Sequence, residues 1–220
     1  MKKPEIRYLN DMKDVVYDKK WLKIAKNFPV YYVYRGAKKP RRTPPFFRKG
    51  RGLRGKKDGL RYDITVIPPK MLGQEFPKTK GHSHPFKEVY QVLSGEGLFL
   101  LQKCQNKKVK DVFWVKVRKG GVLVIPQGYE HLIINSSKKA LKTGNWLSQK
   151  CRNLYDFIEK MRGACYFAIA QKSKIKNQKS KIKWIKNKNY KKIPKLRFKK
   201  PLKKMPKNLR SFLERAGSST

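Results

Sequence analysis

The segment Gly81–Glu88 constrains this chain more than any other, because it holds two histidines and a glutamate within a short stretch. Successive side chains of an extended strand point to opposite faces, so His82 and His84 point the same way, and Glu88 does too if the chain resumes as a strand. The chain has one further histidine, His131, in a second segment that reads as a hairpin. Three imidazoles and one carboxylate are the ligand set of a His3Glu site, so the two segments predict a common metal centre.

From residue 60 onward, short runs of β-branched and aromatic residues alternate with turns rich in glycine and proline. Strands at this regular spacing indicate a sandwich or a jelly-roll barrel, and Gly95 and Gly97 are expected to supply the backbone angles of a tight hairpin. We therefore predict an all-β jelly-roll fold with a helical or irregular insert at 147–162. The predicted strands are Leu60–Ile67, Glu88–Leu93, Gly97–Gln102, Val109–Val117, Gly121–Ile125, His131–Asn135, Leu141–Trp146 and Gly163–Ala170.

The predicted barrel, residues 60–170, is preceded by two less regular segments. Residues 1–34 read as an N-terminal lead-in that packs on the barrel and contains a strand at 29–34. Residues 35–59 read as a solvated basic loop, because lysine, arginine, proline and glycine dominate there. The lead-in also holds a short helix that Asp18 caps, with an apolar stripe of Trp21, Leu22, Ile24, Ala25 and Phe28.

A basic extension, residues 171–220, follows the predicted barrel. It contains a polar heptad at 171–177 that is repeated at 178–184. One isoleucine in each copy buries little surface, so we expect the duplication to lengthen a hairpin or to be disordered, and the extension to be partly disordered. One more strand is expected around Trp184, Ile185 and Tyr190, and at most a short helix at Leu209–Leu213.

The formal net charge of +43 predicts non-specific attraction to nucleic acids and anionic lipids through counterion release. The basic residues are spread along the whole chain, which favours a general compositional bias over a dedicated nucleic-acid interface. Three widely spaced cysteines without a Cys-x-x-Cys pair predict reduced thiols. No apolar run approaches the length of about 18 residues typical of a membrane span, and no leader is apparent at the start, so a cytoplasmic protein without a membrane segment is expected.

The two histidine segments resemble the paired motifs of the cupin family. The first motif is matched from its histidines onward, although the glycine usual at its start is replaced by Phe76, and the second is matched throughout. Two motifs in the right order are far more specific than one His-x-His pair. The matching residues are His82, His84, Glu88 and Gly95 in the first motif, and Gly120, Pro126, Gly128, His131 and Asn135 in the second.

A narrower resemblance connects the chain with the cupin-type glucose-6-phosphate isomerases of archaea and some bacteria. It runs from about Arg7 to Asn135 and fades beyond Leu141. Its most specific part is the string Thr79–His84, because a generic cupin needs neither the threonine nor the glycine there. The similar segments are Arg7–Met12, Asp63–Pro69, Gly73–Phe76, Lys78–His84 and Glu88–Tyr90.

This resemblance implies a divalent metal, typically Fe2+ with Mn2+, Ni2+ or Zn2+ as alternatives, held by His82, His84, Glu88 and His131. It implies an aldose-ketose isomerisation of a phosphorylated hexose in glycolysis and gluconeogenesis, by a cytoplasmic homodimer. Metal-bound sugar oxygens would favour a cis-enediolate route with Glu88 as base, and a hydride shift is the alternative. Tyr90 shares the parity of Glu88 and is expected to line the pocket. The expected substrate-binding residues are Thr65, Thr79 and Gly81 at the phosphate, with Trp146 and Tyr155 at the positions of family tyrosines.

Two other functions fit the same fold, because a fold does not fix its chemistry. One is another His3Glu metal enzyme, such as an oxygenase or a sugar-modifying cupin. The other is a non-catalytic cupin that binds sugar or RNA. Thr65 and the segment Thr79–Gly81 suit a phosphorylated ligand and therefore favour the isomerase.

Overall fold

The structure, a computed structural model, describes residues 3–38, 59–171, 181–202, 205, 206, 209 and 213. The basic loop lies almost entirely outside the described residues, and so do most of the duplicated heptads and parts of the extension. In chain order the elements are β1 Glu5–Tyr8, α1 Leu9–Met12, α2 Lys19–Ile24, β2 Pro29–Tyr34, β3 Leu60–Ile67, β4 Glu88–Ser94, β5 Glu96–Gln105, β6 Lys108–Arg118, β7 Val122–Ile125, β8 Glu130–Ile134, β9 Leu141–Ser148, α3 Asp156–Lys160, β10 Tyr166–Gln171, β11 Lys181–Lys186 and β12 Arg197–Lys199.

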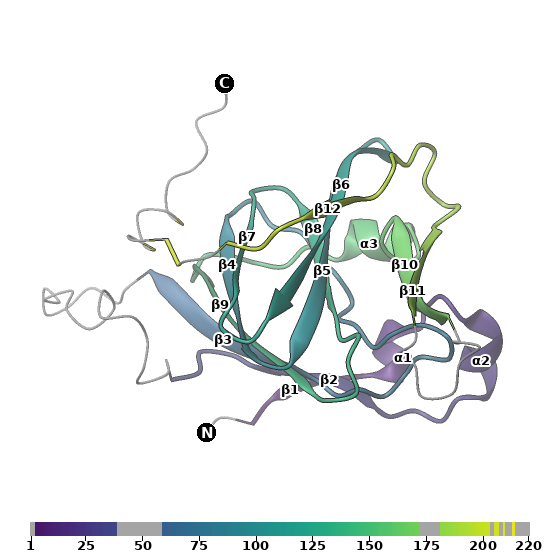
Figure 1. The fold of residues 1–220 in the computed structure, drawn as a ribbon, viewed down its shortest axis with the longest axis horizontal. Helices are drawn as coiled ribbons and strands as arrows, with labels where there is room; N and C mark the ends of the chain where they lie inside the picture. Colours follow the sequence, from purple (N-terminus) through teal and green to yellow (C-terminus); the bar gives the residue numbers. More distant parts are fainter. Residues whose placement is uncertain are drawn as a thin grey trace, which may run out of the picture.

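Two large sheets face each other and form the barrel (Figure 1). The first has six strands in the order β1-β2-β3-β9-β4-β7, and the second has four in the order β12-β6-β5-β8. All pairings within them are antiparallel except β12 with β6. The all-β jelly-roll prediction is confirmed, and each predicted barrel strand has a counterpart within a few residues.

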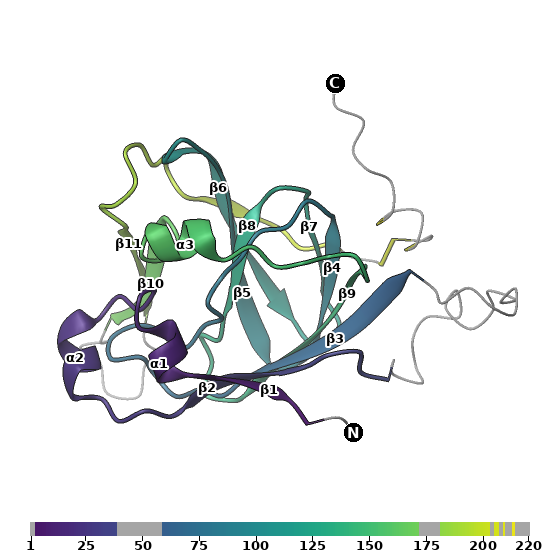
Figure 2. The same ribbon diagram turned by 180° about the vertical axis from the view of Figure 1, so that it is seen from behind.

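The three short helices and the β10–β11 hairpin gather at one end of the barrel, as both views show (Figures 1 and 2). Asp18 caps α2 as predicted, because its carboxylate accepts a hydrogen bond of 3.0 Å from the backbone N–H of Trp21. The predicted apolar stripe is wrong at Ile24, whose side chain is 83% exposed. The helix ends there after only six residues, so its apolar side is too short to include it. The other members of the stripe, Trp21, Leu22, Ala25 and Phe28, pack against the core.

The β4–β5 hairpin uses its two glycines for different reasons. Gly95 has φ +82°, as the predicted tight turn requires. Gly97 has no positive φ, so the prediction that it supplies an unusual backbone angle is wrong. Glycine is needed there for lack of space, because a Cβ would lie 2.7 Å from Leu141 Cδ2.

The hairpin of β10 and β11 carries the ends of the duplicated heptads. Trp184 and Ile185 lie in β11 as predicted, and they pair with Ala168 and Phe167 of β10. Tyr190 does not extend this strand, because the chain turns after β11 and buries the ring of Tyr190 against the barrel. Leu209 and Leu213 are also buried, in a second apolar cluster with Val122 and Trp146.

Candidate metal centre

Backbone pairing brings the two histidine segments together. The N–H of His82 donates to the carbonyl of His131 at 3.1 Å, and the N–H of His131 donates back to the carbonyl of His82 at 2.9 Å. This isolated bridge joins the segment before β4 to β8. Glu88 is the first residue of β4, so its side chain enters the same space.

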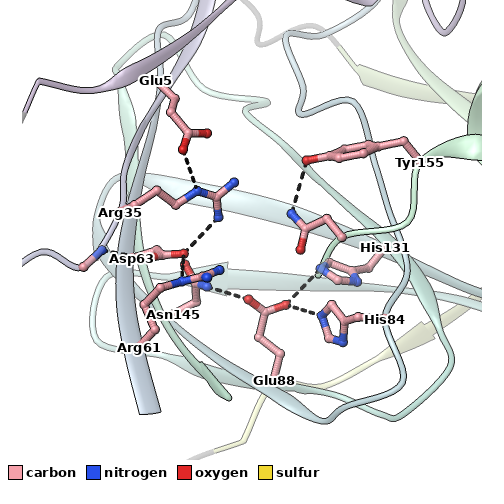
Figure 3. A network of polar contacts seen from close by, with 11 residues as sticks. Glu5, Arg35, Arg61, Asp63, His84, Glu88, His131, Asn145 and Tyr155 are labelled. Carbon is pink, nitrogen blue, oxygen red and sulfur yellow. Dashed lines mark hydrogen bonds and ion pairs between the residues drawn. The ribbon is translucent and has the colours of Figure 1, made fainter. Parts of the chain in front are cut away.

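The four predicted ligands converge on one point. One ligand atom from each of His82, His84, Glu88 and His131 lies within 4.8 Å of the others. Glu88 Oε2 lies 2.9 Å from His84 Nε2 and 3.1 Å from His131 Nε2 (Figure 3). His84, Glu88 and His131 are buried, and His82 is half-buried toward the cavity. We call these four residues the histidine cluster.

Neighbouring groups fix the direction of these ligands. His84 Nδ1 lies 2.7 Å from the carbonyl of Phe86, and His131 Nδ1 lies 3.4 Å from the carbonyl of Tyr129. A carbonyl oxygen only accepts, so each Nδ1 carries the proton and each Nε2 of a neutral ring presents a lone pair. The amide of Asn145 donates to Glu88 Oε1 at 2.5 Å, which holds the carboxylate from its other side.

This donor set fits a divalent cation. When both rings are neutral, the Nε2 lone pairs of His84 and His131 face Glu88 Oε2, and a cation placed between these three atoms would bind to all of them. Among the described residues His131 Nε2 has no hydrogen-bond partner despite its 3.1 Å approach to Glu88, so this buried nitrogen is left for another ligand. Imidazoles oriented by backbone carbonyls are typical of metal ligands, and a His3Glu set suits iron, manganese, nickel or zinc.

The pKa of His82 agrees with a neutral, metal-binding ring. Burial, followed by the neighbouring His131, lowers the pKa of His82 well below its usual range, which keeps the ring neutral. Burial alone would raise the pKa of Glu88, but the adjacent imidazoles of His131 and His84 hold it well below its ordinary value. The pKa of His84 shifts the other way: burial alone would lower it, but its contact with Glu88 raises it, so a proton competes with a cation for this ring. Burial, followed by the charge of Glu88, raises the pKa of Tyr90 well above its usual value, so this hydroxyl stays protonated.

A cavity of about 510 Å³, measured with its open mouth, lies beside the cluster. Of the predicted site residues, Thr65, Thr79, Tyr90 and Tyr155 line it together with His82, Glu88 and His131. The hydroxyl oxygen of Thr79 accepts a hydrogen bond of 3.0 Å from the N–H of Ile133, so its own hydrogen remains to be donated. Gly81 does not line the cavity. Its φ is +88°, and a Cβ added to it would lie 3.4 Å from Leu132 Cβ.

Trp146 is placed differently from the prediction. Its side chain is fully buried and packs on Tyr62 with ring centroids 4.7 Å apart, so it points away from the cavity. The cavity face of β9 carries Asn145 and Leu147 instead. The prediction that Trp146 contacts the substrate is therefore wrong. Side chains alternate along a strand, and the two neighbours of Trp146 occupy the cavity side.

Three polar residues at the site were not predicted from the sequence, namely Asn145 on β9 and Arg61 and Asp63 on β3. Asp63 is 1% exposed and accepts hydrogen bonds from Arg35 and Arg61, each at 2.9 Å (Figure 3). A signal for these residues was present: positions 61, 63 and 65 share one strand face, so Asp63 is expected on the same face as Thr65, which the family resemblance assigns to the site.

The model of one protein family, described as glucose-6-phosphate isomerase (GPI), matches residues 6–185. A glucose-6-phosphate isomerase of Pyrococcus abyssi is 30% identical over 137 residues, which cover 60% of this chain and 62% of that protein. Its namesake from Pyrococcus furiosus is 29% identical over 138 residues, covering 60% and 64%. The chain thus matches less than two thirds of the length of these relatives.

Among solved structures, an oxalate oxidase in complex with the substrate analogue glycolate is 22% identical, with a TM-score of 0.38. The match covers 46% of this chain and 47% of that one. None of the helices in the described part of the chain has the length and apolar character to span a bilayer.

Proposed function

This chain belongs to the cupin-type glucose-6-phosphate isomerase family, and from that premise we propose that it interconverts glucose 6-phosphate and fructose 6-phosphate with a divalent metal. One observation carries the proposal. The Nε2 atoms of His84 and His131 meet Glu88 Oε2 at the floor of a cavity that Thr65 and Thr79 also line.

The reaction moves hydrogen between C1 and C2 of an open-chain sugar. A bound divalent cation supplies Lewis acidity toward the oxygens on these two carbons, and the histidine cluster would hold it. Iron as the metal, a homodimer, and a cytoplasmic role in glycolysis and gluconeogenesis stay predictions from the family resemblance.

Glu88 is the proposed base. Its Oε2 is directed at the imidazoles, so Oε1, next to the Asn145 amide, is the oxygen that can exchange a proton with the sugar. The amide of Asn145 orients this oxygen and makes it less basic, since it already donates a hydrogen bond to it. The proton would then leave the C–H bond for Oε1 and return to the neighbouring carbon from the same atom, while the hydroxyl hydrogen passes from one of the two sugar oxygens to the other.

Tyr90 acts as a donor in this scheme. Its raised pKa keeps the hydroxyl protonated, so it can donate a hydrogen bond to a sugar oxygen or to Glu88 and cannot serve as a base at neutral pH. The hydroxyls of Thr65 and Thr79 are proposed to contact the phosphorylated end of the substrate. Tyr155 lies above His82, with ring centroids 5.7 Å apart, and would shield the sugar from water.

The test is a coupled assay of fructose 6-phosphate conversion with metal-loaded protein and the His84→Ala variant. Loss of the Nε2 ligand should lower turnover by roughly a hundredfold or more, and a chelator should do the same to the native protein. All three histidines of the chain lie in the site, so the control is Arg118→Gln, at an exposed arginine on β6. Turnover that survives both chelation and His84→Ala rejects the metal mechanism. Oxygen uptake without sugar turnover would point to an oxygenase instead.

A further inference from the structure

Four arginines surround the outer end of the metal cavity. They are Arg7 on β1, Arg35 directly after β2, Arg61 on β3 and Arg152 in the segment before α3. They line a hollow of about 660 Å³, measured with its open mouth. We call these four residues the arginine mouth. The hollow shares Arg7, Arg35, Asn153 and Tyr155 with the metal cavity, so the two spaces adjoin each other.

The arginine mouth is not explained by the overall charge of the chain. The sequence contains 43 lysines and 14 arginines, so a random basic surface would be mostly lysine. Seven arginines fall within the part of the chain that the structure describes, and four of these line the hollow. No lysine is among the described residues that line either space. A planar guanidinium binds a tetrahedral oxyanion with two parallel hydrogen bonds, which lysine cannot do.

Two of the guanidiniums are held in place before any ligand arrives. Asp63 accepts from Arg35 Nη1 and Arg61 Nε at 2.9 Å each and from the N–H of Gly36 at the same distance (Figure 3). Each arginine uses one donor in this contact and keeps others for a ligand. Arg35 also donates from Nε to Glu5 at 3.3 Å.

The remaining two arginines are less constrained. Arg7 contacts the hydroxyls of Tyr31 and Tyr155. Arg152 is exposed, and no ion pair joins it to a carboxylate among the described residues. Four guanidiniums set against the carboxylates of Asp63 and Glu5 leave two positive charges at the mouth, which is the charge complement of a phosphate dianion.

We propose that the arginine mouth is the anion subsite that binds the phosphoryl group of the substrate while the sugar carbons reach the histidine cluster. This inference rests on the proposed function and extends it. Thr65 and Thr79 offer hydrogen bonds but no charge, so they cannot neutralise a dianion. The mouth supplies that charge, and its position next to the metal cavity sets the orientation of the ligand, with its anionic end outward and its C1 and C2 oxygens inward.

The experiment compares full-length Arg61→Gln and Arg152→Gln with the native protein and with Arg118→Gln. Arg118 is the matched control, because its side chain is 79% exposed, it pairs with Glu96, and it lies on β6 outside both hollows. Calorimetric titration with inorganic phosphate gives a Kd that does not depend on turnover. Coupled assays give KM and kcat for fructose 6-phosphate.

Each mouth variant should weaken phosphate binding and raise KM by about tenfold or more, because a hydrogen bond to a charged group is lost, with kcat changed little. Arg118→Gln should change neither. Arg152→Lys keeps the charge but loses the planar fork, so it should fall between the native protein and Arg152→Gln. Thermal unfolding checks the fold of Arg61→Gln, and the exposed Arg152 provides a variant without that concern.

The outcomes separate the two proposals. Phosphate binding and KM that stay native in both mouth variants, or that weaken equally in Arg118→Gln, would overturn the arginine mouth and leave the isomerase proposal intact. Phosphate binding that depends on Arg61 and Arg152, without isomerisation by the native protein, would retain the anion subsite and reject the isomerase.

Discussion

Two buried polar clusters lie on opposite faces of β8, and they differ in how their hydrogen bonds are satisfied. His131 belongs to the histidine cluster, and the preceding residue, Glu130, belongs to the other, because consecutive side chains of a strand point to opposite faces. In this second cluster Gln102 Nε2 donates to Glu130 Oε2 and to the Tyr190 hydroxyl, each at 2.8 Å. Gln102 Oε1 accepts from the N–H of Cys165 at 2.7 Å. We call Gln102, Glu130, Tyr190 and Cys165 the glutamine cluster.

The comparison shows how a structural cluster and a ligand site can be told apart. In the glutamine cluster each of these donors meets an acceptor, and the Tyr190 hydroxyl donates onward to the carbonyl of Gly163 at 3.0 Å. In the histidine cluster the Nε2 lone pairs of neutral rings face a carboxylate, and His131 Nε2 has no hydrogen-bond partner within the described part of the chain. Both clusters are buried, so the contrast is not one of exposure. A satisfied network contributes to stability, whereas an excess of acceptors creates affinity for a cation.

The largest expected effect on stability comes from disrupting the glutamine cluster while leaving the histidine cluster intact. Gln102→Ala removes one of the hydrogen-bond partners of Glu130 and the acceptor of the Cys165 N–H, and it leaves a small cavity. The free energy of unfolding should fall by about 3 kcal/mol, because buried polar groups lose their hydrogen bonds. Urea unfolding measures the change, and kcat of the folded fraction should stay near native.

The matched control is Gln91→Ala. Gln91 makes only an exposed contact of 3.5 Å to the carbonyl of Gly120, so its loss should cost less than about 0.5 kcal/mol. Equal destabilisation by the two substitutions would mean that the glutamine cluster has no special role in stability.

Metal addition should stabilise the protein through the histidine cluster alone. Mn2+ at about one hundred times its Kd should raise the free energy of unfolding of the metal-free protein by about 2.7 kcal/mol, because it binds the folded state only. His82→Ala should lose most of this response, and Gln102→Ala should keep it from a lower baseline. Thermal unfolding with and without metal tests this, and a response that survives His82→Ala would place the cation elsewhere.

The sequence predicted the histidine cluster because its pattern is local. His82, His84 and Glu88 share one strand parity within a single segment, and His131 is the only other histidine of the chain. The same reasoning predicted the barrel strands, whose apolar runs and glycine turns are also local features. Local patterns therefore suffice to locate the four ligands.

The parts that were missed depend on how distant strands align. Asn145 faces the cavity because it lies opposite Tyr90 of β4 and Asp63 of β3, and the same register turns Trp146 toward Tyr62. No single segment contains that register. Four separate segments likewise form the arginine mouth, which exists only because β1, β2, β3 and β9 are neighbours in one sheet.

The smallest expected effect is on how the free energy of unfolding changes with pH. The slope that Glu130 contributes has the opposite sign to that of an ion-paired carboxylate. Burial raises the pKa of Glu130, although hydrogen bonds from Gln102 and Cys104 oppose this, so the folded state holds the proton more tightly than the unfolded state. The contribution of Glu130 to the free energy of unfolding is fully present below the pKa that this group has in the unfolded chain. It is lost as pH rises through the pKa of the folded state, by at most about 1.4 kcal/mol per pH unit. Glu130→Gln should remove that slope in urea titrations between pH 4 and about 8.

Glu96→Gln is the control, because its slope has the opposite sign. Burial alone would raise the pKa of Glu96, but ion pairs of 2.9 Å with Lys116 and 2.8 Å with Arg118 lower it. Its contribution is therefore present above the unfolded pKa and is lost as pH falls through the folded one. The test is the difference between the native protein and Glu130→Gln in the free energy of unfolding, plotted against pH. If this difference did not change with pH, the carboxyl of Glu130 would be ionised in the folded protein. The glutamine cluster would then contain an unpaired buried charge, and its contrast with the histidine cluster would disappear.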